Sequence, residues 1–200
     1  MNKVTPRFLT SSLIALGLFS CAAFGQETPR SDKHYVGLLA TAIEHRSIGQ
    51  SDEDCWGQAA TLVIGGHLSD LIHAEVRLGG GLADAEISRG DLSLAVDYFG
   101  SWYMGLHYPI TDYANLYGQF GFSYIHGEGE ISDPANDRNN PYLDLEGEFP
   151  DSGFSISWIA GLDFEVMDDT FLVFEGGKLF EDTGTDVNTF QFSGGLRYEF

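Results

Sequence analysis

The chain has little cysteine and little positive charge. Only Cys21 and Cys55 occur among its 200 residues, too few for a disulfide framework or a multi-thiolate metal site. Lysine and arginine together number 10 against 30 acidic residues, which gives a formal net charge of −20. Nucleic acid is bound by basic surfaces. The composition therefore predicts that nucleic acid is not a partner.

Residues 1–25 have the pattern of a secretory signal. The pattern consists of a basic start (Lys3, Arg7), an apolar stretch (8–19) and small residues at −3 and −1 of a cleavage point (Ala23, Gly25). The apolar stretch is shorter than the roughly 20 residues of a membrane-spanning helix. We predict that this segment is removed and that residues 26–200 form one domain.

Cys21 leaves one alternative, because it follows Leu18, Phe19 and Ser20 in the manner of a lipoprotein processing site. Bulky Phe19 fits that pattern poorly, and the mass of the mature N-terminus would distinguish the two products. Cleavage before Gln26 leaves 8 basic and 30 acidic residues, a formal charge of −22. It also leaves Cys55 as a single thiol, which we expect to be free and in a loop.

Apolar side chains in the rest of the chain recur at every second position, and no long segment has helical periodicity. The clearest example is LSLAVDYFGSWYMGLHY at 92–108, where Leu92, Leu94, Val96, Tyr98 and Trp102 fall on one face. Successive side chains of a strand point to opposite faces, so this alternation predicts strands. Alternation that continues for ten residues or more predicts unusually long ones.

The predicted fold class is all-β: an eight-stranded antiparallel up-and-down transmembrane β-barrel. The expected strands are 34–45, 58–68, 71–80, 92–108, 115–126, 153–166, 171–180 and 189–200. Tight turns at 69–70, 111–114 and 167–170 alternate strictly with long acidic connections around 46–57, 81–91, 127–152 and 181–188. Outer membrane barrels have short periplasmic turns and long external loops.

The physical chemistry of a bilayer agrees with this assignment. A tilted strand of about 9–11 residues spans the membrane, and the strands must close because lipid cannot satisfy an open edge. The apolar positions of the last strand would then face lipid; they are Phe190, Phe192, Leu196, Tyr198 and Phe200. Aromatic residues near strand ends, such as Tyr108 and Tyr124, would form the interfacial girdles.

The signal sequence, the eight alternating segments and the C-terminal RYEF resemble the OmpA/OmpX-type outer membrane β-barrel family, over essentially the whole mature chain. The resemblance implies location in the cell outer membrane. It also implies that Tyr198 and Phe200 are read as a signal by the outer membrane assembly machinery. The remaining partners that it implies are outer membrane lipids and lipopolysaccharide.

Charged residues of the strands fall on the face opposite the apolar stripe. They are Glu75, Arg77, Asp97, Asp163, Glu165, Glu175, Arg197 and Glu199, and His67, His73 and His107 share that face. In an eight-stranded barrel this face is a narrow interior that side chains can fill. Buried charges must pair, so we predict a polar network in the lumen. An ion path or gate is the alternative.

The four long loops hold 17 acidic residues against Arg46, Arg89 and Arg138. A solvated acidic surface is the simplest interpretation. Binding of a divalent cation such as Ca²⁺ is an alternative, but the D-x-x-x-D spacing does not match an EF-hand loop, so we assign no metal ligand and no cofactor. Lys178 is expected on the lipid face near the outer end of its strand, where lipopolysaccharide phosphates could meet it.

Catalytic residues are not evident. His67 and Ser69 resemble the His-x-Ser element of lipid A deacylases, but they lie at a predicted periplasmic turn, and a Ser-Asp turn explains them more simply. We predict a non-enzymatic barrel with a role in envelope integrity or surface interaction, in which the acidic loops could meet an extracellular ligand. A narrow channel for small solutes or ions is the first alternative, and a lipid-modifying enzyme is the second.

Overall fold

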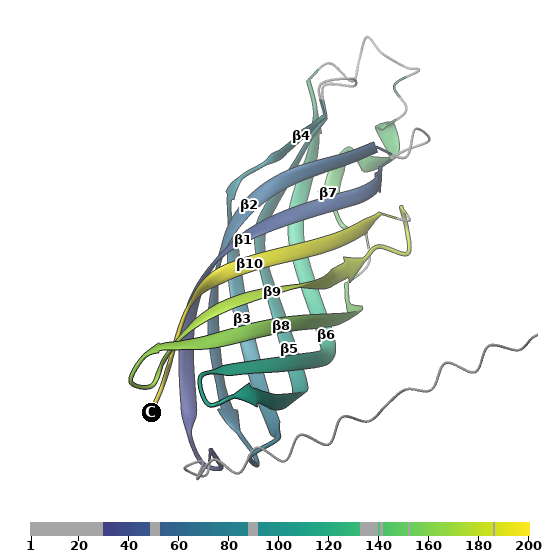
Figure 1. Ribbon diagram of the computed structural model, residues 1–200. Coiled ribbons are helices and arrows are strands. Elements are labelled where there is room, and N and C mark those ends of the chain that lie inside the picture. Colours follow the sequence, from purple (N-terminus) through teal and green to yellow (C-terminus); the bar gives the residue numbers. More distant parts are fainter. Residues whose placement is uncertain are drawn as a thin grey trace, which may run out of the picture.

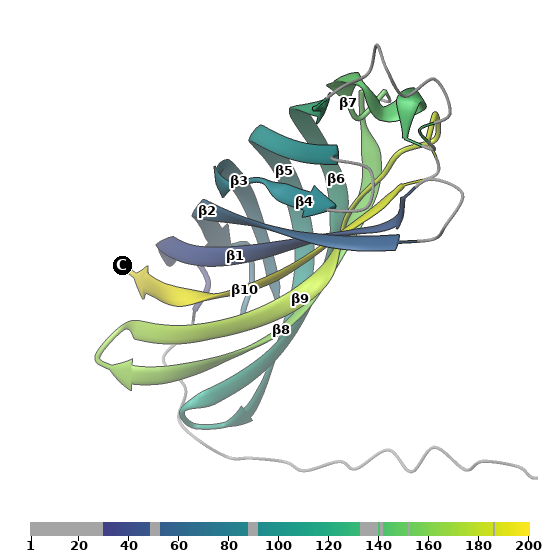
Figure 2. The ribbon, with the colours of Figure 1, turned by 90° about the horizontal axis from the view of Figure 1, so that it is seen from above.

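Eight long strands form a closed antiparallel barrel in the computed structural model (Figures 1 and 2). The structure describes residues 30–48, 53–87, 92–132, 140, 142–151, 153–185 and 187–200. The long strands are β1 (His34–Ile48), β2 (Glu53–His67), β3 (Ile72–Ala83), β5 (Leu92–Thr111), β6 (Ala114–Ile131), β8 (Ser155–Met167), β9 (Thr170–Glu181) and β10 (Asn188–Glu199). The predicted signal segment, its cleavage point and Cys21 lie outside the described residues.

Closure joins the first strand to the last. Each long strand pairs with its neighbours in chain order, and β1 pairs with β10 from Tyr35↔Glu199 to Arg46↔Asn188. The terminal residue extends this pairing, because the backbones of His34 and Phe200 exchange two hydrogen bonds of 2.9 and 2.8 Å. The predicted fold class is confirmed.

The barrel has two unlike ends. At the turn end, short connections join β2 to β3, β5 to β6 and β8 to β9, and both ends of the described chain lie here (Figure 1). At the loop end, the described chain adds β4 (Ala85–Ile87), the 3₁₀ turn η2 (Leu143–Leu145) and β7 (Gly147–Phe149). Strand β4 pairs with β5 and β7 pairs with β6, so both lengthen the barrel wall.

The strands extend further at the loop end than the sequence predicted. Strand β2 begins at Glu53 rather than at residue 58, and β6 continues to Ile131 rather than to residue 126. The prediction that Cys55 lies in a loop is therefore wrong. Cys55 lies within β2, 3% exposed, because its side chain points into an apolar cluster at this end of the barrel.

Side chains alternate between a buried interior and an exposed apolar exterior. Strand β1 shows the pattern, since Tyr35, Leu39 and Ile43 are buried while Leu38 is 66% exposed. Interior rings need space over the neighbouring strand, where each of two rings lies against its paired glycine. A Cβ at Gly65 would lie 2.4 Å from the Tyr35 ring, and one at Gly79 would lie 2.0 Å from the Phe99 ring. Glycine at these two positions lets the narrow interior hold aromatic side chains.

A bulge in β5 changes which face each residue occupies. The register with β6 shifts between Val96 and Tyr98, so that residue 97 has no direct partner. Such an extra residue reverses the alternation beyond it. Val96 therefore points inward while Tyr98 points outward, although the sequence placed both on one face. Leu92 and Leu94 are likewise buried rather than on the outer face.

No helix in the described part of the chain is both long and apolar enough to span a membrane.

Candidate functional site: the barrel interior

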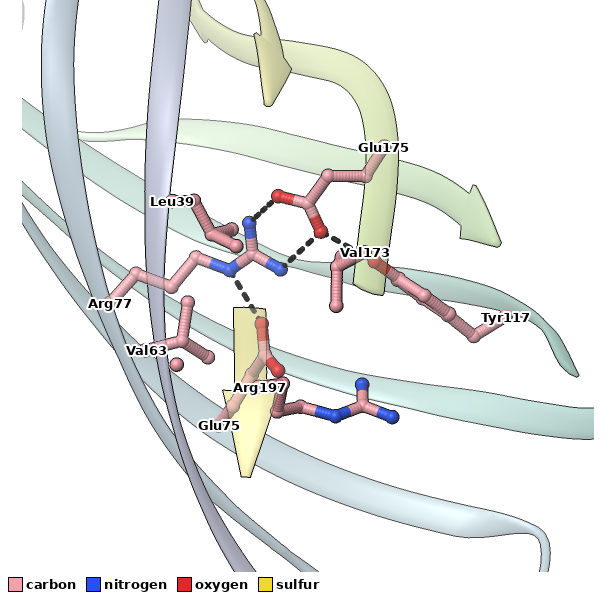
Figure 3. A pocket seen from close by; sticks show the side chains of 9 residues that line it. Leu39, Val63, Glu75, Arg77, Tyr117, Val173, Glu175 and Arg197 are labelled. Atoms are coloured by element: carbon pink, nitrogen blue, oxygen red, sulfur yellow. Dashed lines mark hydrogen bonds and ion pairs between the residues drawn. The ribbon is translucent and has the colours of Figure 1, made fainter. Parts of the chain in front are cut away.

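Arg77 is the centre of the largest charged group in the interior. From β3 its guanidinium donates to Glu75 on the same strand and to both carboxylate oxygens of Glu175 on β9 (Figure 3). Its Nη2 also donates to Oε1 of Gln119 at 3.2 Å. Arg77 is 2% exposed, so this fully buried cation is held by two carboxylates. The fork of a guanidinium suits such two-point pairing.

Two tyrosines supply the remaining donors to these carboxylates. Tyr35 donates to Glu75 over 2.9 Å, and Tyr117 donates to Glu175 over 2.6 Å. Each hydroxyl offsets part of the cost of keeping a second carboxylate beside one arginine. The group leaves a small cavity, with room for about one water molecule.

A second charged group lies nearer the turn end, around Arg197 on β10. Its Nη2 is 2.6 Å from Oδ2 of Asp163 and 3.3 Å from Oε1 of Glu199. Asn115 donates to the other oxygen of Asp163. The Arg197 guanidinium also lies 4.9 Å from the centre of the Tyr35 ring, which separates it from the Arg77 group. Both groups are buried ion pairs from several strands.

Three histidines meet at the turn end. The ring centres of His67, His73 and His107 are 5.5 to 6.1 Å apart. Nε2 of His67 lies 3.3 Å from Glu199, and Nε2 of His107 lies 2.8 Å from Nη1 of Arg30. Among the described residues, however, no group of three or more His, Cys, Asp or Glu side chains is arranged to hold a metal ion.

Toward the loop end, hydroxyl groups replace the charges. Thr41 bonds to Thr61 and to Ser193 at 2.8 and 3.0 Å, and Ser123 bonds to Ser101 and Ser157 at 2.7 and 2.8 Å. These six side chains all point inward from their strands, and each is 6% exposed or less. They form a belt that satisfies its own hydrogen bonds and carries no charge.

Beyond the hydroxyl belt the interior is mostly apolar, although Gln191, His45 and Thr189 are also buried there. The first layer, named here the apolar plug, consists of Ile43, Ala59, Val96, Phe99, Ile125, Leu179 and Phe180. The second, named the loop-end core, consists of Ile48, Cys55, Ala85, Ile87, Leu92, Leu94, Ile131, Tyr142, Leu145, Phe149 and Val187. Both layers are buried, so the interior runs from charged side chains at the turn end to a dry core at the loop end.

His45 and Cys55 lie within this apolar part. His45, opposite Cys55 in the register of β1 and β2, is fully buried, and burial lowers its pKa to about 4. Burial also raises the pKa of the Cys55 thiol to about 12, with a smaller contribution from Asp54. Charged forms are disfavoured here because water is excluded. Cys55 is therefore a neutral thiol that packs as a small apolar side chain.

The structure places six of the eight charged side chains predicted for the lumen in the two ion-pair groups. Asp97 and Glu165 differ from that prediction. The side chain of Asp97 is 58% exposed because the β5 bulge turns it outward, 3.9 Å from His126. Glu165 is exposed at the turn end, where a register shift with β9 precedes the turn and its carboxylate accepts a hydrogen bond from the backbone of Asp169.

The two residues that resembled a hydrolase element have structural partners. His67 points to Glu199, whereas Ser69 accepts hydrogen bonds from the backbone nitrogens of Leu71 and Ile72 at 3.4 and 3.0 Å. Ser69 is thus part of the β2–β3 turn.

Sequence reasoning missed several polar members of the interior. Tyr117, Gln119 and Asn115 lie on the inward face of β6 and bond to the charged groups. The strict alternation of β6 could have identified them, since Leu116, Gly118 and Phe120 occupy the outward positions. No alternation could have identified Arg30, because it precedes the first strand.

The outer wall carries the expected apolar band. Phe192, Leu196, Tyr198 and Phe200 are exposed, and Phe190 is half-buried under the Arg46 guanidinium. At the loop-end edge of the band, Trp56 stacks with Phe192, and Tyr98, Tyr124 and Phe154 form a row of contacting rings. Lys178 lies on this wall and pairs with Glu181.

Comparison with known proteins identifies the same architecture. A family model described as the outer membrane protein beta-barrel domain matches residues 11–200. Among solved structures, Neisserial surface protein A is 14% identical, with a TM-score of 0.57 over 84% of this chain and 97% of that one. Ail, the attachment invasion locus protein of Yersinia pestis, is also 14% identical, with a TM-score of 0.54 over 85% and 99%.

A third similar structure is the outer membrane protein OprG from Pseudomonas aeruginosa, which is 10% identical with a TM-score of 0.50 over 86% of this chain and 97% of that one. At these identities the likeness concerns the fold. No curated protein matches the chain.

Proposed function

The chain belongs to the outer membrane protein β-barrel domain family, and we propose that it displays a fixed acidic surface on the outside of the cell for contact with a partner. The orientation follows from loop length: the turn end would face the periplasm and the loop end the exterior. Export through cleavage before Gln26 and recognition of Tyr198 and Phe200 by the assembly machinery are parts of the same proposal.

The loop-end core is the observation that carries this proposal. It joins the wall strands to two segments that are otherwise peripheral, β4 and residues 142–149. Tyr142 is fully buried and donates to Glu53 on β2 over 2.8 Å, which fixes η2 against the wall. An external segment with its own buried core presents side chains in set positions, and this reduces the entropy that a partner must remove on binding.

The charge of this surface indicates the kind of partner. Exposed acids at the loop end come from several elements: Asp54, Asp84, Glu86, Asp97, Glu128, Glu130, Glu146, Glu148 and Glu181. Potentials of opposite sign favour encounter and exclude partners of like charge. We therefore propose a cationic partner. An anionic partner such as lipopolysaccharide would need divalent cations to bridge it to the acidic surface. Ail is described as the attachment invasion locus protein of Yersinia pestis, which makes attachment the first role to test.

A narrow channel remains the second candidate because part of the interior is polar. The charged groups around Arg77 and Arg197 and the hydroxyl belt line this part, beside a buried cluster that includes Leu39, Val63 and Val173. The apolar plug and the loop-end core oppose conduction, since ions do not enter a dry apolar core. We therefore expect little or no steady conductance.

An enzymatic role has no support in the arrangement of the interior. Family members are non-enzymatic barrels, and each histidine of the turn end faces a structural partner. We propose that the chain acts without a catalytic residue or a cofactor.

Adhesion by cells that carry the protein tests the display proposal. Cells should adhere to surfaces coated with polylysine more than to surfaces coated with heparin. Neutralising Glu128, Glu130 and Glu148 as glutamines should reduce adhesion to polylysine. Glu165→Gln, at the opposite end, is the matched control and should not. Adhesion equal to that of cells without the protein would contradict the proposal.

A further inference from the structure

Residues 30–33, named here the strap, form a turn at the turn end of the barrel. The backbone nitrogen of Lys33 donates to the carbonyl of Arg30 at 3.0 Å, and two backbone hydrogen bonds of 3.3 and 2.9 Å join the strap to His67 at the end of β2. Oδ1 of Asp70 accepts from the backbone nitrogen of Arg30 at 3.0 Å, and Nζ of Lys33 pairs with a carboxylate of the β8–β9 turn at 2.7 Å. These contacts do not involve the side chain of Arg30, so they hold the strap without it.

The side chain of Arg30 lies in a pocket that offers three kinds of partner. Its Nη1 donates to Nε2 of His107 at 2.8 Å, since a guanidinium has donors but no acceptor. Its Nε lies 3.8 Å from Oε2 of Glu199, and its guanidinium carbon lies 5.0 Å from the centre of the Phe171 ring. A neutral acceptor, a carboxylate and an aromatic face together suit a planar guanidinium.

Strands of the barrel wall form this pocket. His107 lies on β5, Phe171 on β9 and Glu199 on β10, and each is 3% exposed or less. Glu199 is also held by Arg197 and by His67, at 3.3 Å each. The pocket is therefore built by residues whose positions the wall fixes, and it should keep its shape when the side chain of Arg30 is absent.

The charges around the pocket favour a cation within it. The guanidinium of Arg197 lies 2.6 Å from Asp163 and 3.3 Å from Glu199, so one guanidinium of the wall serves two carboxylates. Arg30 supplies the second positive charge of this group. Without it, a buried carboxylate would lack a full counter-charge, which is costly. An emptied pocket should therefore take up another cation of suitable shape.

The pocket faces the solvent at the turn end. The side chain of Arg30 is 22% exposed, whereas the carboxylate of Glu199 beside it is 1% exposed. The resident guanidinium thus has one side in water and the other against the buried partners. A small ligand could reach the same place from the turn end without crossing the barrel.

We propose that the turn end carries a guanidinium-binding pocket, which the chain occupies with its own Arg30. The ligands of this class are alkylguanidinium ions, either free guanidino compounds or the arginine side chains of peptides. While Arg30 is seated, the pocket is closed to them, so the strap makes an autoinhibitory contact. The pocket lies at the end opposite the proposed display surface and does not depend on that function.

Chemical rescue of R30A, in the mature protein held in detergent micelles, tests the proposal. Ethylguanidinium contains the atoms that this substitution removes, and ethylammonium is the control of equal charge. At millimolar concentration, far below the molar range of denaturation, ethylguanidinium should raise the thermal unfolding midpoint of R30A in a saturable manner. Ethylammonium should raise it much less, and neither ion should raise that of the wild type. If R30A does not refold alone, ethylguanidinium present during refolding should restore the folded fraction.

Two further variants separate the pocket from general stabilisation. K33A loses the pair with Asp169 but keeps Arg30 in the pocket, so it should lose some stability without responding to ethylguanidinium. R30A/E199Q lacks the carboxylate of the pocket, and its apparent affinity for ethylguanidinium should fall at least about tenfold. The proposal is overturned by equal rescue with ethylammonium or by an equal response in K33A or R30A/E199Q. It is also overturned if ethylguanidinium raises neither the midpoint nor the refolded fraction of R30A.

Discussion

Arg77 on β3 and Glu175 on β9 form a two-point ion pair across the interior, although their strands are not neighbours in the barrel. The pair therefore connects opposite walls rather than adjacent strands. Wall strands are already joined by backbone hydrogen bonds. The ion pair adds a direct connection through the centre.

Arg77→Ala should lower the free energy of unfolding strongly, because it leaves Glu75 and Glu175 buried without their cation. The expected loss is about 3–5 kcal/mol. Urea unfolding in lipid vesicles would measure it. Lys178→Ala is the matched control, since its pair with Glu181 lies on the outer wall, and it should cost no more than about 1 kcal/mol. Equal losses in both variants would contradict the central role of Arg77.

Phe99→Ala should open the interior more than Arg77→Ala does. Phe99 fills the apolar plug over Gly79, and its removal leaves a cavity beside the hydroxyl belt. We expect a loss of about 3–5 kcal/mol in stability and the appearance of brief single-channel currents in planar bilayers. If instead Arg77→Ala conducts and Phe99→Ala does not, the charged groups form the barrier and the channel alternative is favoured.

His45 should make stability depend on pH in the acid range. It lies at the loop end of β1. The preceding residue, Glu44, pairs with exposed Trp56 on β2. Its pKa is lowered from 6.5 to about 4 in the folded protein, so the unfolded state binds the proton more tightly. This contribution is complete above pH 6.5 and is lost as pH falls toward 4, by about 3 kcal/mol.

The variant H45Q removes this titration. Its free energy of unfolding should vary less than that of the wild type between pH 7 and pH 4, by urea unfolding at each pH. Parallel curves for the wild type and H45Q would rule out a contribution from this residue.

Deletion of Phe200 should impair insertion in cells more than it weakens the finished barrel. The residue is 64% exposed and its backbone pairs with His34, so the lost burial in lipid is at most about 1.5–3 kcal/mol. Refolding into detergent should be largely preserved while the amount in the outer membrane falls. Equal loss in both settings would assign Phe200 to stability alone.

Epitope tags should report the orientation. A tag near Asn139 should bind antibody on intact cells, because the sequence predicts that 127–152 is the longest external connection. Tags at Asp112 and Asp169, in tight turns, should bind only after the cells are permeabilised. Binding at the turns of intact cells would reverse the proposed orientation.

The strands could be predicted from sequence because their alternation is long and uninterrupted. In β8, Trp158, Ala160 and Leu162 face outward, so periodicity alone assigns the face as far as Asp163. The loop end could not be predicted in this way. Val96 and Tyr98 are two residues apart and point to opposite faces, since the bulge between them depends on pairing with β6.

The contacts between interior side chains could not be predicted from the sequence either. Alternation places Arg77 and Glu175 on the inward face, but their contact depends on the closure of the barrel, which sets non-neighbouring strands opposite one another. Cys55 and β4 were assigned to loops because acidic residues surround them. Their burial comes from the loop-end core, to which several separate segments contribute.

The loop-end core has an immunological consequence. Its buried side chains hold residues 85–87, 92–94 and 142–149 together, so the surface above them is assembled from pieces far apart in sequence. Antibodies raised against a short linear peptide from any one piece would encounter that piece in a different conformation. The intact barrel, inserted in vesicles, is therefore the immunogen that should raise antibodies able to recognise living cells.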